Sequence, residues 1–499
     1  MSLQLEQKRK KNNPLLQACL ILILVLSACL PDNPDRDTTP VPINAVPATS
    51  TSIPKTERPV YSPGELVEYT AQSGDTLVNL ATRFNTTIEE ILNENPVIPA
   101  DATTLPPGLP MQIPIYYEAL WGSQFQIMPN CAFVNGPAQI DFDIESFVQS
   151  QPGWFKYFEQ FAAEEQRSGA EIITYISTSF SISPKLLLSL LEYQLNALSD
   201  PIQPDNLLDG YPLGYRSSGY HGLYIQLVWA ANILNQGYYG WQGSHLDTLE
   251  FMDRTIEHPD PWQNSATVAI QYYFSHLEPK AVYSRTIHTD GFQKIYQDLF
   301  GDPWTCQPHI PGSLRQPQMT LPFKGGETWA FTGGPHTGWG QGDPWAALDF
   351  APPSAETGCE ITTAWAAAVA PGIIARSETG LIELDLDGDG DYRTGWVLLY
   401  LHLGTQNKIT VNTLVETGDN LGHPSCEGGE STGSHIHIAR KYNGEWIPAA
   451  DVIPFNLGGW IAHAGTREYQ GTLELFSDTV IASTDAEEKS LISYPRPAP

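Results

Sequence analysis

The sequence predicts a multidomain protein with a small βααβ module, a mainly-α middle domain and a mainly-β C-terminal domain. Its 499 residues exceed what one hydrophobic core usually organises, and a prior of about 150 residues per domain suggests roughly three domains. Prolines gather in separate stretches, as they do in linkers, and the apolar pattern changes from helical spacing to short strands across the last stretch. These proline-rich stretches are residues 31–63, 96–114 and 303–322.

The chain is strongly acidic. A formal net charge of −30 excludes a general binder of polyanions, because a basic patch is the minimum requirement for holding phosphate backbones. Nucleic acid is therefore not an expected partner.

The N-terminal residues 1–28 have the layout of a signal peptide. A basic cluster at residues 8–11 precedes an apolar stretch at residues 15–26, which is shorter than the about 20 residues that a membrane-spanning helix needs. The stretch closes on the letters LSAC, which resemble the lipobox of bacterial lipoproteins. The resemblance implies that Cys29 carries lipid and becomes the new N-terminus. The alternative is an ordinary signal peptide followed by a coincidental cysteine.

The segment after Cys29 is expected to be a disordered tether over residues 29–64. It is rich in Pro, Thr, Ser and Asp and shows no apolar period. These features together predict an exported protein that is anchored to the cell membrane through lipid and faces the cell wall or periplasm.

Four cysteines other than Cys29 remain after the signal peptide, and an exported protein meets an oxidising compartment. Several pairings are possible. The preferred hypothesis joins Cys359 to Cys426 within the last domain and Cys131 to Cys306 across the middle domain.

Residues 65–115 form the first predicted domain. Apolar residues at i, i+3, i+4 and i+7 define one face of a helix that Asp75 could cap. Thr87 and Glu90 have the spacing of a capping box for a second helix. Short strands at residues 67–70 and 111–113 complete a βααβ unit. The apolar positions of the first helix are Leu77, Leu80, Ala81 and Phe84.

Short motifs along this module, YT, SGDTL, NP and PG, appear in the order found in LysM domains, which the module closely resembles. The resemblance implies that loops of the module bind glycans containing N-acetylglucosamine, chiefly peptidoglycan. The alternative is a small helical module with no ligand, because short motifs also occur by chance.

The middle domain, residues 140–303, is helix-like and rich in aromatic residues. Ser183 and Pro184 can begin a helix with a leucine stripe. That helix is weakly similar to the helix that carries the catalytic glutamate of lysozyme-like transglycosylases, but the matching position is Gln194, which cannot donate a proton as a carboxylic acid does. Glu192 lies about 200° round the helix.

A non-catalytic helical domain, possibly a degenerate lysozyme-like one, is therefore expected. Its aromatic residues could stack on sugar rings or pack in the core. Those residues are Tyr238, Tyr239 and Trp241.

Residues 318–458 change to short strands and glycine turns, which predicts a mainly-β domain. The expected strands cover residues 329–332, 346–350, 372–375, 380–386, 395–402 and 434–439. Residues 459–499 are expected to be a C-terminal tail of unassigned role.

Histidines carry the chemistry of this domain. His435 and His437 would leave one face of a strand, about 7 Å apart along the backbone. An HxH pair alone is a weak signal. The motifs GGPH, ALDF, YLHL and STGSHIH, however, occur in order and together resemble the lysostaphin-type (LytM-like) zinc endopeptidases over residues 325–456.

The resemblance implies that His336, Asp349 and His437 bind Zn²⁺, and that His402 and His435 act as catalytic histidines. Most family members place the first histidine four residues before the aspartate, whereas this chain has a longer gap. The staphylolytic branch also has a longer gap, which leads us to expect that His336 is brought in on a glycine-rich loop.

The sequence therefore predicts a cell-envelope peptidoglycan hydrolase. In this hypothesis the LysM module locates the wall, and a zinc-dependent endopeptidase cuts its peptide cross-links. The alternative is a non-enzymatic peptidoglycan-binding regulator of other wall hydrolases.

Overall fold

The fold is taken from a computed structural model that describes residues 60–116, 118–353, 358–359 and 362–494. The predicted signal peptide, Cys29 and most of the predicted tether lie outside the described residues. A search of the described helices finds none with the length and hydropathy needed to cross a membrane.

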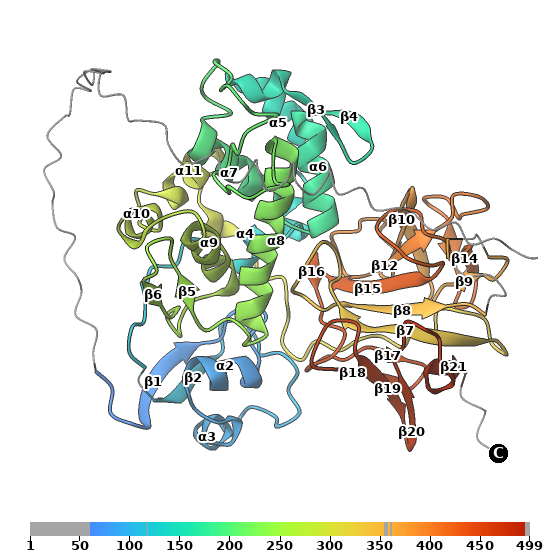
Figure 1. The fold of residues 1–499 in the computed structure, drawn as a ribbon. Helices are drawn as coiled ribbons and strands as arrows, with labels where there is room; N and C mark the ends of the chain where they lie inside the picture. Colours follow the sequence, from blue (N-terminus) through green and yellow to red (C-terminus); the bar gives the residue numbers. More distant parts are fainter. Residues whose placement is uncertain (1–59, 117, 354–357, 360–361, 495–499) are drawn as a thin grey trace, which may run out of the picture. The chain divides into compact units, whose positions relative to one another are not determined.

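The N-terminal module is a two-stranded antiparallel sheet with two short helices (Figure 1), in agreement with the predicted βααβ order. The predicted capping box at Thr87 and Glu90 is present. Leu80, Phe84 and Ile91 are fully buried in its core. The elements are β1 (Glu65–Thr70), α2 (Leu77–Arg83), α3 (Ile88–Glu94) and β2 (Pro110–Ile115).

The prediction that Asp75 caps α2 is wrong. Thr76 is the N-cap and forms a reciprocal capping box with Asn79. The Asp75 carboxylate is buried instead, where it accepts a hydrogen bond from the Tyr69 hydroxyl at 2.6 Å and pairs with Arg83 at 2.9 Å. Burying an unpaired carboxylate would be energetically costly, so the pairing of Asp75 with Tyr69 and Arg83 has a structural role in the module.

The middle region is helical, as predicted. The long helix α8 lies against α9 (Figure 1), and Ser183 with Pro184 begins α7 as expected. Its helices are α4 (Asn130–Phe133), α5 (Ile144–Ser150), α6 (Gly169–Phe180), α7 (Pro184–Leu195), α8 (Leu223–Gln242), α9 (Ser265–Ser275), α10 (Lys280–Thr286) and α11 (Phe292–Phe300). Its strands form two hairpins, β3 (Glu159–Ala162) with β4 (Glu165–Ser168), and β5 (Leu249–Glu250) with β6 (Ile256–Glu257).

The polar and aromatic residues singled out in this region have structural partners. Gln194 donates to the Leu213 carbonyl and accepts from the Tyr273 hydroxyl, and Glu192 accepts the Leu198 amide. The predicted aromatic residues are all buried, so they pack in the core and do not offer a platform for sugar rings. They are Tyr238, Tyr239 and Trp241.

The C-terminal domain is built on a nine-stranded antiparallel sheet with the order β13-β10-β11-β12-β15-β8-β7-β21, and β16 pairs with β15. A four-stranded sheet, β17-β18-β19-β20, follows in the sequence (Figure 1). The strands are β7 (Thr328–His336), β8 (Ala347–Ala351), β9 (Ala366–Ala367), β10 (Gly372–Glu378), β11 (Gly380–Asp385), β12 (Trp396–Leu403), β13 (Leu414–Val415), β14 (Asn420–Gly422), β15 (Ile436–Tyr442), β16 (Glu445–Trp446), β17 (Asn456–Leu457), β18 (Trp460–Ala464), β19 (Gly471–Leu475), β20 (Asp478–Ile481) and β21 (Leu491–Ser493).

The described residues after Gly459, up to residue 494, form strands of the domain, so the expected end of the domain at residue 458 is too early. They form β18 to β21, and β21 pairs with β7 in the main sheet. Leu473 and Ile492 are buried in the same core as Trp329 of β7. The segment contributes an edge strand and apolar side chains to the domain.

Both preferred cysteine pairs are bonded in the structure. Cys131 and Cys306 are joined with an S–S distance of 2.04 Å, and Cys359 and Cys426 with 2.16 Å. The first bond closes a loop that contains almost the whole helical region.

A buried carboxylate connects three distant segments of the chain. Glu445 on β16 accepts hydrogen bonds from the Tyr238 hydroxyl at 2.6 Å and from the Gln242 amide at 2.8 Å, both on α8. His309, in the segment before the β domain, lies 2.7 Å from the same carboxylate.

Candidate metal centre

Three neighbouring strands bring the predicted ligands together. Asp349 on β8 lies directly opposite His437 on β15 on one side and Gly333 on β7 on the other. Residues paired across adjacent antiparallel strands share a face and lie about 5 Å apart, so this register places the carboxylate and the imidazole side by side.

His336 does not come from a loop, which corrects the expectation from the long gap. It is the last residue of β7 and pairs with Ala347, and two register shifts along β7 turn it toward Asp349. Gly333 makes this possible, because a Cβ there would lie 2.5 Å from a carboxylate oxygen of Asp349. The glycine-rich residues 337–346 form the return connection from β7 to β8.

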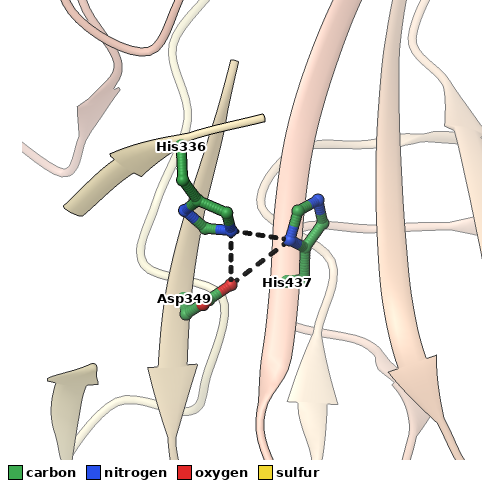
Figure 2. A group of neighbouring side chains, drawn as sticks. All are labelled: His336, Asp349 and His437. Atoms are coloured by element: carbon green, nitrogen blue, oxygen red, sulfur yellow. Dashed lines mark hydrogen bonds and ion pairs between the residues drawn. The ribbon is translucent and has the colours of Figure 1, made fainter. Parts of the chain in front are cut away.

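The three side chains converge on one point (Figure 2). Nε2 of His336 lies 3.0 Å from Nδ1 of His437, and each nitrogen lies 3.3 Å from Oδ1 of Asp349. All three residues are buried.

The outer nitrogens of the two imidazoles determine what the inner nitrogens can do. Nδ1 of His336 lies 2.8 Å from the Gly334 carbonyl, and Nε2 of His437 lies 3.2 Å from the Gly338 carbonyl. A carbonyl only accepts, so these outer nitrogens carry the protons of the neutral rings. The inner nitrogens then present lone pairs toward each other and toward the carboxylate. Lone pairs at such separations repel unless a cation lies among them.

The electrostatics of the cluster also favour a cation. Oδ1 of Asp349 is buried and has no hydrogen-bond donor within the described part of the chain. Burial opposes ionisation of Asp349, but the neighbouring histidines outweigh it and hold the pKa of this carboxyl well below its usual range. Burial lowers the pKa of His336, but Asp349, the Gly334 carbonyl and Glu468 together raise it above its usual value. Either a proton or a metal ion between the two inner nitrogens and Oδ1 of Asp349 would therefore remove the repulsion among their lone pairs.

The two remaining predicted histidines lie beside the cluster. The rings of His402 and His435 are 4.6 Å apart, and Nε2 of His435 lies 3.7 Å from Oδ1 of Asp349. Each ring directs Nδ1 to a backbone carbonyl, of Glu427 and Gly433 respectively. Burial and the nearby histidines lower the pKa of His402 to about 3, so its ring is a neutral imidazole.

Tyr469 was missed in the sequence because it lies in the presumed tail. Its half-exposed ring stacks on His336, with centroids 4.2 Å apart and an interplanar angle of 21°. The Gly334 amide donates to the Tyr469 carbonyl, and a Cβ on Gly334 would collide with the backbone of Gln470. In the sequence, the glycine pair shortly before His336 was the available sign that another part of the backbone approaches closely here.

A second cluster of acidic side chains belongs to a turn and is not part of the candidate metal centre. The side-chain oxygens of Asp385, Asp387 and Asp389 lie within 4.8 Å of one another, but Asp385 accepts the Gly390 amide and Asp387 accepts the Asp389 amide. These contacts fit the ordinary chemistry of a hairpin turn between β11 and β12.

Comparison with known proteins relates the β domain, with its buried His-Asp-His cluster, to metallopeptidases. Two family models match the chain: the LysM domain over residues 69–114, and the N-terminal domain of LasA over residues 126–313. The possible lysozyme-like relationship of the helical region stays a prediction.

The β domain is similar to the beta-lytic metalloendopeptidase of Lysobacter enzymogenes, with 31% identity over 136 residues, 26% of this chain and 71% of that protein. The chain therefore belongs to the beta-lytic family of metalloendopeptidases. Protease LasA of Pseudomonas aeruginosa strain UCBPP-PA14 is 24% identical over 355 residues, 68% of this chain and 78% of LasA. The solved structure of the deep-sea M23 metalloprotease pseudoalterin is 24% identical and covers 34% of this chain and 96% of its own, with a TM-score of 0.29.

Proposed function

We propose that the protein is a zinc-dependent endopeptidase that cuts peptide cross-links of peptidoglycan and is targeted by its LysM module. The observation that carries the proposal is the convergence of three buried lone-pair donors on one point. Family membership supports peptide-bond cleavage, and the LysM match supports a glycan-bearing substrate.

Zinc fits the donor set. His336, Asp349 and His437 would hold it, because two imidazoles and one carboxylate are a common ligand set for catalytic zinc and leave a position open. Their outer contacts also fit, since ligating histidines usually donate their other N–H to a backbone carbonyl. Bound zinc would supply Lewis-acid chemistry that polarises a peptide carbonyl and makes a water molecule more acidic.

His402 and His435 are proposed to move protons. Because each ring directs Nδ1 to a backbone carbonyl, each leaves the lone pair of Nε2 free. One Nε2 can accept a proton from the attacking water and then return the same proton to the leaving amine. Because the two rings make the same kind of backbone contact, turnover of His402→Ala and His435→Ala would show which of them carries that proton.

We further propose that the protein is exported and held at the membrane through Cys29. The N-terminal pattern supports this location, and so do the two disulfide bonds, which form and persist in oxidising compartments.

The function is tested by digesting purified peptidoglycan and analysing the released fragments. The full chain is expected to release new amino groups without new reducing sugar ends, and a chelator should stop the reaction until zinc is restored. His437→Ala should abolish both zinc binding and cleavage. His463→Ala is the matched control, because the exposed His463 on β18 lies 3.6 Å from the exposed Glu474, away from the three proposed ligands.

Unchanged fragments from protein that is fully loaded with zinc would reject the endopeptidase and favour the regulator that the sequence left as an alternative. New reducing ends would instead assign glycan cleavage to the helical region.

A further inference from the structure

The segment His309–Leu314, here called the strap, connects the helical region to the β domain and lies on two loops of the LysM module. One loop contains Ser73, between β1 and α2. The other contains Thr103 and Thr104, between α3 and β2. Every contact between the strap and these loops described below joins residues more than 200 positions apart.

The loop at Thr103 and Thr104 binds the backbone of the strap. The Thr104 hydroxyl donates to the Pro311 carbonyl at 2.7 Å and accepts the Leu314 amide at 2.9 Å. The Thr103 hydroxyl donates to the Leu314 carbonyl at 2.6 Å, and the Ser313 amide donates to the Thr104 carbonyl at 2.8 Å. Two threonines therefore bind two amides and two carbonyls of this short stretch of the strap.

The loop that contains Ser73 also binds a peptide group of the strap through a hydroxyl. The Ser73 hydroxyl accepts the Ile310 amide at 2.9 Å. Ile310 itself is buried against the β domain, and His309 holds Glu445. The strap is thus fixed on its far side by the β domain and presents its peptide groups to the LysM module.

The approach between the strap and the module is close because Gly312 has no side chain. A Cβ on Gly312 would lie 2.6 Å from Cγ and 2.8 Å from Cα of Pro106. The backbone of Gly312 has no positive φ, so the glycine serves packing alone.

We propose that the strap occupies the glycan-binding groove of the LysM module and competes with N-acetylglucosamine chains for it. The acetamido group of that sugar carries one N–H and one C=O, the same two kinds of group that the strap offers to the loops. Loops that hold both amide donors and amide acceptors are therefore equipped to bind an acetamido group. The inference rests on the proposed glycan targeting and adds that the wall-binding site is closed by the chain itself.

Competition between the strap and the glycan would lower the apparent affinity of the LysM module for the glycan. A site that is open for only a fraction of the time binds with an affinity reduced by that fraction, so separating the strap from the module should strengthen binding. Gly312→Leu makes this separation, because the added side chain must enter the space of Pro106. Gly325→Leu is the matched control, because no heavy atom lies within 4 Å of a Cβ built at that position and its φ is not positive.

The experiment measures binding of the N-acetylglucosamine hexamer to the full chain by calorimetry. Gly312→Leu is expected to bind about tenfold more tightly or better than the parent protein, and Gly325→Leu should match the parent. Equal affinity of all three proteins would overturn the proposal. Cleavage of peptidoglycan by the parent protein is scored separately, so loss of the proposed endopeptidase function would not be confused with loss of the strap.

If Gly312→Leu does not fold, hydrogen exchange in the parent protein tests whether the hexamer displaces the strap. Saturating hexamer should increase exchange at the amides of Ile310, Ser313 and Leu314, since their acceptors on the loops would be taken by sugar. Unchanged protection of these amides in the presence of bound hexamer would show that sugar binds elsewhere.

Discussion

Tyr469 covers one face of the His336 ring, and this contact is expected to hold the imidazole in its binding orientation. Groups that orient a metal ligand typically contribute about tenfold to a hundredfold to metal affinity. Tyr469→Ala should therefore weaken zinc binding by about that factor, while Tyr469→Phe, which keeps the ring, should bind zinc as the parent does. Competition with a chromophoric chelator measures both. Equal weakening by both substitutions would mean that the hydroxyl, and not the stacked ring, is what matters.

His402 has a different expected signature. Its ring lies beside the cluster but is outside the trio of converging donors, so His402→Ala should leave zinc content unchanged. A proton-transfer group contributes about a hundredfold to ten-thousandfold, and kcat should fall by that amount. Metal analysis together with turnover on a cross-linked peptide provides the check. Loss of zinc from His402→Ala would place this histidine among the ligands.

Much of the candidate site could be read from the sequence because its residues lie in short, ordered motifs. His336, Asp349 and His437 each occupy a motif of a few residues, and the strands around them carry the expected apolar runs. Tyr469 could not be found in this way, because its contact with His336 depends on a chain reversal after the presumed end of the domain. A contact between residues that are far apart in the chain produces no recognisable pattern in the sequence around either of them.

At the scale of elements, a buried charge network crosses the main sheet. Glu383 on β11 lies 2.6 Å from Lys441 on β15 and 3.2 Å from Arg376 on β10, and the side chains of Glu383 and Lys441 are each 1% exposed. Because the strand that carries Lys441 also carries His437, this network supports the strand that holds a proposed ligand.

Removing the shared carboxylate should be costly. Glu383→Ala would leave the Lys441 ammonium buried without its partner, and breaking a buried pair costs about 3–5 kcal/mol. Glu378→Ala is the control, because Glu378 pairs with the same Arg376 but its side chain is 55% exposed, and exposed pairs contribute about 1 kcal/mol or less. Urea unfolding of both variants gives the comparison. Similar losses would mean that Lys441 finds another way to be neutralised or solvated.

The elements themselves were predicted unevenly, for physical reasons. The buried strand β12 is an almost continuous apolar run, interrupted only by His402, and such a run gives a clear signal. The strands β19 and β20 are mostly exposed on one side and contribute few core residues, so their apolar signal is weak. Asp75 was assigned to a helix cap because aspartate is a common cap, yet the tertiary contact with Arg83 is the stronger interaction.

At the scale of the molecule, the helical region and the β domain share the carboxylate of Glu445. Glu445→Ala would remove this acceptor from the buried Tyr238 hydroxyl, the buried His309 ring and the partly buried Gln242 amide. Orphaned buried donors cost about 1–3 kcal/mol each, so the full chain should lose several kcal/mol. Glu474→Ala, at an exposed pair with His463, is the control.

Calorimetry should detect the loss in a specific way. The parent protein is expected to show the helical region and the β domain unfolding in one transition, because the shared carboxylate couples them. Glu445→Ala should separate this into two transitions. Two transitions already present in the parent would show that the shared carboxylate does not couple the two regions.

The same carboxylate sets a rule for shortening the protein. A fragment that begins at residue 318 would keep the catalytic strands and Glu445 but lose every side-chain donor described here for it, leaving an unpaired charge on a newly exposed apolar face. Water would solvate the freed carboxylate, but the apolar side chains beside it, such as Trp446, would be exposed and are expected to make the fragment aggregate. An engineered minimal enzyme should therefore combine the deletion with a polar replacement of Trp446, which packs against the helical region in the full chain.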